Sequence, residues 1–306
     1  MNKNNHYQLN RFIFTENYLH MKIALFGASG FIGSHLKMAL RSHDHELTLV
    51  NRDGFKKSDA DFCADYINRQ DVVINLAGAP ISGKWSEHYK KELYDSRIET
   101  TRKIAKAILN APEPPKCLIN ASAVGIYDDK TKHTEESHGF ADNFLAKLCQ
   151  DWEAEAMKVH SACRVVILRI GVVLSKDEGA LEKMAPPFKK GIGARIGNGN
   201  QGVSWIHIDD LVEIFLFVID HLEIVGVVNA VGVYPTDNYN FSDSLGKMFG
   251  QPVYFSIPKF LLKFIFGEGS LLLTEGQKAV PEKLLKYGFQ FQYISVDKAL
   301  TGIYRE

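Results

Sequence analysis

The chain has 306 residues, of which 45% are hydrophobic and 24% charged, and its 36 basic residues balance its 36 acidic ones. This length exceeds the usual size of one domain, which predicts a large α/β domain with a smaller lobe. Because charges of both signs are interspersed, the sequence offers no basic stripe for a phosphate backbone, and nucleic acid is excluded as a partner.

The spacing of the cysteines and the hydropathy of the chain indicate in which cellular compartment the protein is expected. The four cysteines are widely spaced, without a Cys-x-x-Cys pair: Cys63, Cys117, Cys149 and Cys163. This spacing fits neither a disulfide framework nor a zinc site, so we expect a reducing compartment and no bound metal. No apolar run reaches the roughly 18 residues that a membrane span needs, and the most apolar segment, Ile257–Thr274, is expected to be a packed amphipathic helix. A cytoplasmic protein without a membrane partner is predicted.

Residues 1–20 are expected to be a polar N-terminal extension. They contain no apolar core and no small-residue cleavage site, so they do not resemble a secretory signal. Met21 stands directly before the first expected strand. Translation from Met1 and translation from Met21 both remain open.

Short apolar runs alternate with helical stretches, a pattern that predicts parallel strands covered by helices. Strands are expected at Ile23–Phe26, Leu47–Asn51, Val72–Leu76, Cys117–Ala121, Val165–Arg169 and Val227–Ala230. Helices are expected at Phe31–Ser42, Glu87–Leu109 and Asn143–His160, and in the other gaps. The fold class is therefore α/β, with a Rossmann-type doubly wound parallel sheet over residues 21–232.

The pattern changes after Leu174. Six glycines between residues 179 and 202 are typical of loops over a site, so residues 175–205 are expected to form a substrate-side loop. From residue 233 onward the alternation of strand and helix is lost. A smaller, mostly helical C-terminal lobe is predicted for residues 233–306.

Residues 27–33 read Gly-Ala-Ser-Gly-Phe-Ile-Gly and stand between the first strand and the first helix. Glycines permit a turn tight enough for backbone N–H groups to reach a pyrophosphate at the helix N-terminus, and the last glycine lets helix and strand approach closely. A plain strand-to-helix turn is the alternative. The candidate cofactor-binding residues of this glycine turn are Gly27, Ser29, Gly30, Phe31, Ile32 and Gly33.

The second strand ends in Val50-Asn51-Arg52. In such folds a carboxylate at this place accepts a hydrogen bond from the ribose of NAD, whereas an arginine pairs with the 2′-phosphate of NADP. Asn51 can hydrogen-bond a phosphate without repelling it, and Arg52 can bind it through two N–H groups. NADP is therefore favoured over NAD, although Asp53 follows directly and a surface arginine without a ligand is the alternative.

Two further segments are candidates for contacts with the dinucleotide. Leu76, Ala77 and Gly78 close the third strand, where small residues let the backbone lie against the adenosine half. Glu92 and Arg97 belong to the helix that follows, where a solvated helix face explains such charges equally well.

Several motifs together resemble the extended short-chain dehydrogenase/reductases: the glycine turn, Asn75–Gly78, Ala121–Tyr127, Arg169–Leu174 and Trp205–Leu211. Four segments are similar to the atypical epimerase-family branch: Asn75–Trp85, Asp95–Thr101, Asp151–Glu153 and Glu275–Pro281. Members of that branch are named NAD-dependent epimerase/dehydratases or nucleoside-diphosphate-sugar epimerases. Their C-terminal domain has no known function. The resemblance runs from Met21 to the end. It implies cofactor contacts at Asn51, Arg52, Leu76, Ala77, Glu92, Arg97 and Val173.

The sequence departs from this group in its acid–base machinery. Active short-chain reductases use a Tyr-x-x-x-Lys pair, in which nearby positive charge lowers the pKa of the tyrosine so that it exchanges a proton with the substrate oxygen. The corresponding helix reads Asn143-Phe144-Leu145-Ala146-Lys147-Leu148-Cys149, and neither residue of the pair is expected at that spacing.

Ser122 and Tyr127 remain as candidate catalytic residues near the carboxyl end of a central strand, where they could donate hydrogen bonds to a substrate oxygen. The alternative is structural: Ser122 satisfies a loop and Tyr127 packs under the nicotinamide. His207, between apolar neighbours, is interpreted as a structural histidine.

Two functions follow from these observations. The first is an NADP-dependent oxidoreductase or sugar-nucleotide epimerase/dehydratase that acts on a small molecule, with a nucleotide sugar as one candidate. The second is a non-catalytic NADP-binding regulatory protein, which the absent Tyr/Lys pair motivates. The sequence identifies neither the substrate nor the oligomeric state.

Overall fold

The structure is a computed structural model, and it describes residues 20–176 and 178–305. Apart from His20, the expected N-terminal extension lies outside the described residues, and so does the choice between Met1 and Met21 as the start. Within the described ranges, no helix combines the length and the apolar character that crossing a bilayer requires.

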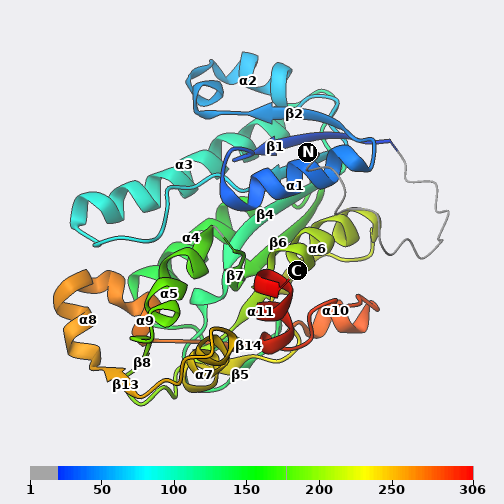
Figure 1. Cartoon of the computed structure of the whole chain (residues 1–306). Coiled ribbons are helices and arrows are strands. Elements are labelled where there is room, and N and C mark those ends of the chain that lie inside the picture. Colours follow the sequence, from blue (N-terminus) through cyan, green and yellow to red (C-terminus); the bar gives the residue numbers. More distant parts are fainter. Residues whose placement is uncertain (1–19, 177, 306) are drawn as a thin grey trace, which may run out of the picture.

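Six parallel strands form the central sheet, in the order β11-β6-β4-β3-β1-β2 (Figure 1). Their bounds are β1 Lys22–Phe26, β2 Glu46–Val50, β3 Val72–Asn75, β4 Cys117–Ala123, β6 Arg164–Ile170 and β11 Gly226–Ala230. Since β2 and β3 lie on opposite sides of β1, the strand order reverses there, and open α/β sheets bind ligands outside the carboxyl ends of strands at such a point. The predicted doubly wound parallel sheet is confirmed.

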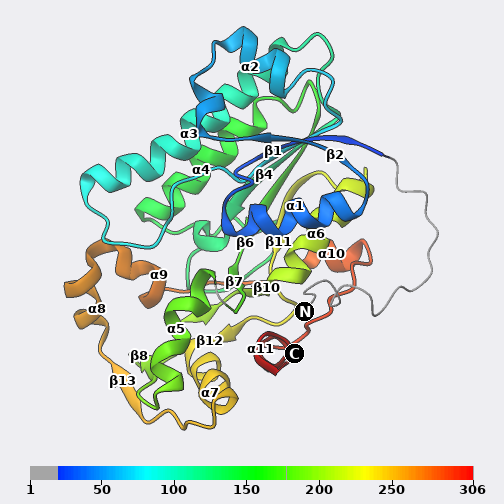
Figure 2. The same ribbon diagram turned by 45° about the horizontal axis from the view of Figure 1, so that its top comes forward.

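Helices cover both faces of this sheet (Figure 2). One face carries α1 Phe31–Ser42 and α6 Ile208–Asp220, and the other carries α2 Asp59–Tyr66, α3 Glu87–Asn110 and α4 Phe144–Met157. In β1, Ile23 and Leu25 pack with the α1 side, whereas Ala24 and Phe26 pack with the α2 and α3 side. A strand buried on both faces requires such a continuous apolar run.

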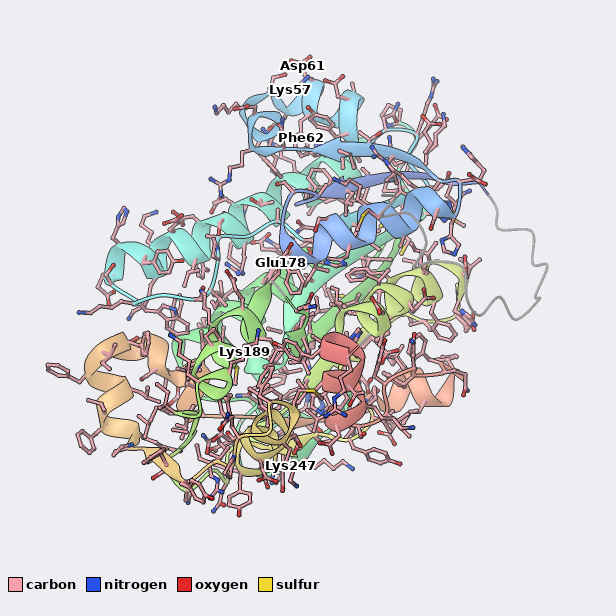
Figure 3. The ribbon with its side chains drawn as sticks, in the orientation of Figure 1. Lys57, Asp61, Phe62, Glu178, Lys189 and Lys247 are labelled. Atoms are coloured by element: carbon pink, nitrogen blue, oxygen red, sulfur yellow. The ribbon has the colours of Figure 1, made fainter. Side chains whose placement is uncertain are left out.

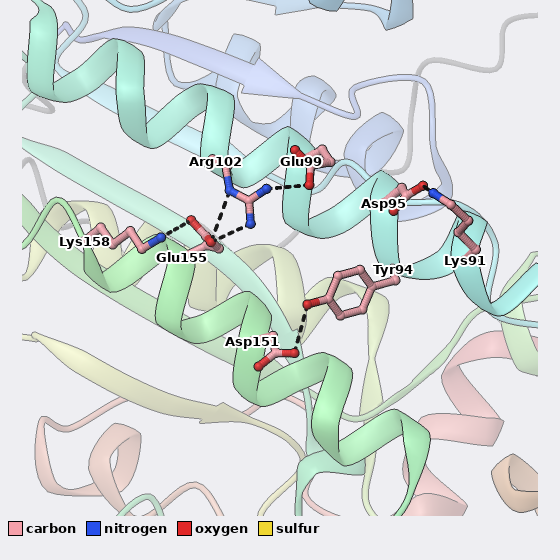
Figure 4. Close-up of polar contacts among 8 residues, drawn as sticks. All are labelled: Lys91, Tyr94, Asp95, Glu99, Arg102, Asp151, Glu155 and Lys158. Carbon is pink, nitrogen blue, oxygen red and sulfur yellow. Dashed lines mark hydrogen bonds and ion pairs between the residues drawn. The ribbon is translucent and has the colours of Figure 1, made fainter.

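Polar contacts fix α3 against α4 (Figure 4). Arg102 of α3 donates to Glu155 of α4 at 2.9 Å, and Tyr94 donates to Asp151 at 3.0 Å. Because both carboxylates belong to α4, these contacts hold α4 at a defined tilt. They thereby set the place of its first residues above the carboxyl ends of the strands.

The remaining elements are short, and most of them form the lobe in the lower part of Figure 1. The helices are α5 Gly179–Lys189, α7 Asn238–Met248, α8 Lys259–Phe266, α9 Leu271–Thr274, α10 Glu282–Lys286 and α11 Val296–Arg305. The strands are β5 Lys132–His133, β7 Val172–Leu174, β8 Ala194–Ile196, β9 Gly202–Val203, β10 Trp205–His207, β12 Thr236–Asp237, β13 Phe255–Ile257 and β14 Lys278–Ala279. The 3-10 helices are η1 Arg52–Lys56, η2 Val124–Ile126 and η3 Gly267–Ser270.

Residues 175–205 are not the loop that their glycines predicted. They contain α5, which buries three apolar residues at helical spacing, Leu181, Ala185 and Phe188. Pro186 and Pro187 concealed this helix in the sequence, because proline normally ends a helix. Figure 3 shows α5 running from Glu178 toward Lys189 in the lobe. The segment therefore begins with α5 and continues through β8 and β9 to the start of β10, rather than forming one open loop.

The prediction of one packed amphipathic helix over Ile257–Thr274 is also wrong. The segment divides into α8 and α9 around Gly267, whose φ of 59° lies in the left-handed region. Helix α8 buries only Leu262, while Phe260 is 75% exposed and Phe264 is 83% exposed. The apolar face of α8 thus lies on the surface.

A network of buried hydrogen bonds joins the sheet to the C-terminal segment. Asn229 of β11 donates from Nδ2 to the carbonyl oxygen of Val280 at 3.0 Å. The Glu135 carboxylate accepts from the backbone N–H groups of Asn229 at 3.1 Å and Lys283 at 3.2 Å. Burial raises the pKa of Glu135 because it disfavours the charged carboxylate, and the hydrogen bonds from these two N–H groups act in the opposite direction.

Candidate functional site

The glycine turn follows β1 and lies between the carboxyl ends of β1 and β3. Gly27 has a φ of 82°, and a Cβ there would stand 2.8 Å from the carbonyl of Leu76. At Gly33 a Cβ would stand 2.2 Å from the carbonyl oxygen of Gly27. Both positions therefore require glycine. The Gly30 N-cap of α1 has no side-chain hydrogen bond, so the first N–H groups of the helix are available to an anion.

The residues expected to bind the adenosine phosphate, Asn51 and Arg52, follow the end of β2. Asn51 accepts a hydrogen bond from the backbone N–H of Gly54 at 3.1 Å and caps η1. The exposed side chain of Arg52 has no hydrogen bond or ion pair within the described residues. Lys56 pairs with Asp53 at 2.6 Å and neutralises the carboxylate that counted against NADP. The guanidinium of Arg52 is thus available to a phosphate.

Asn75 organises the turn that follows β3. Its side chain is fully buried and donates to Asn120 at 2.7 Å and to Thr101 at 2.9 Å. Its Oδ1 accepts from the backbone N–H of Ala77 at 3.2 Å. The backbone of Leu76 and Ala77 is thereby pinned against Gly27, as a turn that carries half of a dinucleotide site requires.

Arg97 of α3 lies beneath Gly78, where a Cβ would meet its guanidinium at 3.1 Å. Arg97 donates to the carbonyls of Leu93 at 3.1 Å and Ala79 at 3.0 Å, and no described carboxylate pairs with it. Burial lowers the pKa of Arg97, and its positive charge lies beside the turn that follows β3 without a carboxylate partner among the described residues. Glu92 is exposed and is not brought together with Arg97.

Val173, a residue expected to contact the cofactor, lies on β7. Val173 is buried and pairs with Ile206 of β10, next to the bridge between Leu174 and Gly179. A Cβ on Gly179 would stand 2.7 Å from the ring of Phe31. The start of α5 therefore lies against the first residue of α1, which brings Val173 and the glycine turn close together. Ser29 of the turn is exposed, and Ile32 is half-buried.

Ser122 and Tyr127 take part in a buried network. Ser122 donates to Glu153 at 2.6 Å, and Glu153 also accepts two bonds from Arg169, at 2.8 and 2.7 Å. The hydroxyl of Tyr127 accepts from Arg169 at 2.8 Å and lies 2.9 Å from Oδ1 of Asn229. Burial raises the pKa of Tyr127, and its side chain is 0% exposed. These contacts favour the structural alternative for both residues, and their catalytic role stays a prediction.

His207 also has a structural place. Its Nδ1 accepts from the backbone N–H of Asp209 at 3.1 Å and caps α6. Its ring stacks on Tyr293 with centroids 3.7 Å apart. Burial lowers the pKa of His207 to about 4, so the ring is neutral near pH 7.

The N-terminus of α4 occupies the place of the missing Tyr-x-x-x-Lys pair. Lys147 follows Asn143 by four residues, so the expectation that neither residue stands at this spacing is wrong for the lysine, and asparagine stands at the place of the tyrosine. Lys147 is largely exposed and pairs with Asp151 at 2.7 Å. Asn143 caps α4 and donates to the carboxylate of Glu275 at 3.2 Å. Sequence reasoning missed this contact, because only the Glu-Gly-Gln motif pointed to Glu275.

Comparisons with known proteins agree with this arrangement. Residues 23–231 match the NAD dependent epimerase/dehydratase family, and residues 257–303 match DUF1731, a domain of unknown function. The chain is 35% identical over 300 residues to the chloroplastic epimerase family protein SDR39U1 homolog of Arabidopsis thaliana, an alignment that covers 92% of this chain and 86% of that protein.

Two solved structures extend the comparison. The crystal structure of human epimerase family protein SDR39U1 (isoform 2) with NADPH has a TM-score of 0.86 and 33% identity, covering 94% of this chain and 100% of that one. The nucleoside-diphosphate sugar epimerase from Corynebacterium glutamicum has a TM-score of 0.75 and 26% identity, covering 94% of this chain and 58% of that one. The predicted resemblance to the epimerase family is confirmed. This chain therefore belongs to the NAD-dependent epimerase/dehydratase family.

Proposed function

We propose that this protein is a cytoplasmic NADP(H)-dependent oxidoreductase that acts on a small carbonyl or hydroxyl compound. The observation that carries the proposal is Arg52, an unpaired guanidinium at the end of β2 beside an Asp53 already neutralised by Lys56. Such a guanidinium suits the 2′-phosphate that distinguishes NADP from NAD. The crystal structure of the human relative with NADPH supports the same cofactor.

The candidate residues fit the parts of a dinucleotide. The glycine turn and the N-terminus of α1 would hold the pyrophosphate, and Asn51 with Arg52 would hold the adenosine phosphate. The turn at Leu76–Gly78 and Val173 would border the adenosine and nicotinamide halves. The bound nicotinamide would supply or accept a hydride. Four free cysteines, three of them buried, support the reducing compartment.

A thermal-shift titration tests the cofactor assignment. We expect NADP(H) to raise the melting temperature of the wild type more than NAD(H) does, because only the phosphorylated cofactor meets Arg52. Arg52→Ala should weaken NADPH binding by about 1.5–3 kcal/mol, roughly 10- to 150-fold, and leave NADH binding nearly unchanged.

Arg41→Ala is the matched control, since Arg41 is an exposed arginine in the last turn of α1. It should retain the wild-type preference. Equal stabilisation of the wild type by NADPH and NADH would refute the NADP assignment, and so would an Arg52→Ala variant with unchanged NADPH affinity.

The buried state of Ser122 and Tyr127 favours a second candidate, a non-catalytic NADP-binding protein. A panel of aldehydes, ketones, quinones and nucleotide sugars with NADPH separates the two; the sugars are included because the Corynebacterium glutamicum neighbour is named for them. Hydride transfer to any compound supports the oxidoreductase. NADPH binding without transfer to any of them supports the non-catalytic protein.

A further inference from the structure

The Glu275–Gln277 segment packs against residues 202–204, beside the carboxyl end of β6 and the start of β7. A Cβ on Gly276 would stand 1.9 Å from the carbonyl oxygen of Gly202, so the two backbones touch. Ser204 donates from Oγ to the carbonyl of Gln277 at 2.8 Å, and its own carbonyl accepts from the N–H of Val172 at 2.7 Å. This chain of contacts places the segment that carries Glu275 beside the start of β7, the strand that carries Val173.

The other side of Glu275 faces the N-terminus of α4. Asn143 donates from Nδ2 to Oε2 of Glu275 at 3.2 Å, while its Oδ1 caps the helix. Helix α4 sits directly on the end of β4, where a Cβ on Gly125 would stand 2.4 Å from Leu145. Two independent sets of contacts therefore place Glu275 at the carboxyl edge of the sheet.

The carboxylate of Glu275 is available at this edge. Its side chain is half-buried, and Oε1 has no hydrogen bond or ion pair among the described residues. The neighbouring ammonium of Lys259 bonds instead to the carbonyl of Thr274 at 2.6 Å. The other two candidates for contact with a substrate oxygen are the hydroxyl groups of Ser122 and Tyr127. Both are engaged in the buried network.

We propose that Glu275 is the group that exchanges a proton with the substrate oxygen, in place of the missing tyrosine; this rests on the proposed function. In the direction from alcohol to carbonyl, the O–H bond of the substrate breaks and its proton bonds to Oε1 of Glu275. The electron pair left on the oxygen forms the C=O bond as the hydride on the same carbon goes to the nicotinamide. In the reverse direction the protonated Glu275 returns the proton to the oxygen.

Asn143 is the positioning residue in this assignment. An asparagine amide can donate to the carboxylate without accepting its proton, so it orients Oε2 and leaves Oε1 for chemistry. Glu275→Gln keeps an acceptor for Asn143 and removes only the charge. That substitution is therefore the informative variant.

The first test compares two nucleotides by calorimetry on the full chain. NADP⁺ carries a positive nicotinamide ring and NADPH a neutral one, so a carboxylate beside the ring favours NADP⁺. Glu275→Gln should lower the NADP⁺-to-NADPH affinity ratio by about five- to tenfold, the order expected when one negative charge beside a cationic ring is removed at a partly exposed site. Glu275→Asp should retain the ratio, and so should Glu282→Gln, an exposed carboxylate on α10.

The second test measures NADPH oxidation with the carbonyl compound that the panel above selects. Glu275→Gln should lower kcat about 100-fold or more, as expected for loss of a general acid. An unchanged affinity ratio, or wild-type turnover by Glu275→Gln, overturns this assignment while the proposed function stands. A wild type that binds neither nucleotide overturns the proposed function instead.

Discussion

Glu153→Gln is expected to lower the free energy of unfolding by about 3–5 kcal/mol. Glu153 and Arg169 are 9% and 4% exposed, and they share two hydrogen bonds of 2.8 and 2.7 Å. Removing the carboxylate leaves the guanidinium buried without a counter-charge, and the hydroxyl of Ser122 loses its ionic acceptor. Urea denaturation followed by circular dichroism measures the change.

Glu99→Gln is the matched control for this prediction. Glu99 pairs with the same residue type, Arg102, but its side chain is 58% exposed. Exposed ion pairs contribute little, so the control should stay within about 0.5 kcal/mol of the wild type. A loss below about 1 kcal/mol in Glu153→Gln would show that water reaches the pair in solution.

Gly33→Ala is expected to reduce NADPH affinity by about 100-fold or more. The added methyl would stand 2.2 Å from the carbonyl oxygen of Gly27 and 2.9 Å from Cα of Ala28, and both are backbone atoms that cannot rotate away. The turn must open, which costs at least two hydrogen bonds to a charged phosphate at about 1.5–3 kcal/mol each. Isothermal titration with NADPH measures this loss.

The same substitution should cost stability of about 1–3 kcal/mol through overpacking, so affinity is measured well below the melting temperature. Met38→Ala is the control, because Met38 lies on the same helix and is 50% exposed. It should bind NADPH as the wild type does. Wild-type affinity in Gly33→Ala would mean that the pyrophosphate does not lie on this turn.

The sequence predicted the central sheet well because burial on both faces leaves an unambiguous apolar run. The strand expected at Val165–Arg169 is β6, Arg164–Ile170, and the helix expected at Glu87–Leu109 is α3, Glu87–Asn110. Local propensity gave wrong predictions where tertiary contacts determine whether a helix continues or ends. Pro186 sits inside a helix that the packing of Phe188 maintains, and Gly267 divides a segment whose apolar composition suggested continuity.

The candidate site shows the same division. Residues of the strand-to-helix turns could be predicted because the carboxyl ends of parallel strands gather at one edge. Glu275 could not, because the residue that binds it, Asn143, lies 132 positions earlier, and no local pattern reports a contact of that span. The cofactor-binding roles assigned to these residues stay predictions until a complex is measured.

The network of buried hydrogen bonds between β11 and the C-terminal segment has a consequence for unfolding. Cutting the chain after residue 232 would remove both Val280 and Lys283, and it would strand Glu135 and Asn229 in the interior without some of their partners. Unfolding of the C-terminal part therefore destabilises the part that contains the central sheet, because buried polar groups there lose their hydrogen-bond partners. Heat should melt the two as one cooperative unit, with calorimetric and van't Hoff enthalpies in agreement.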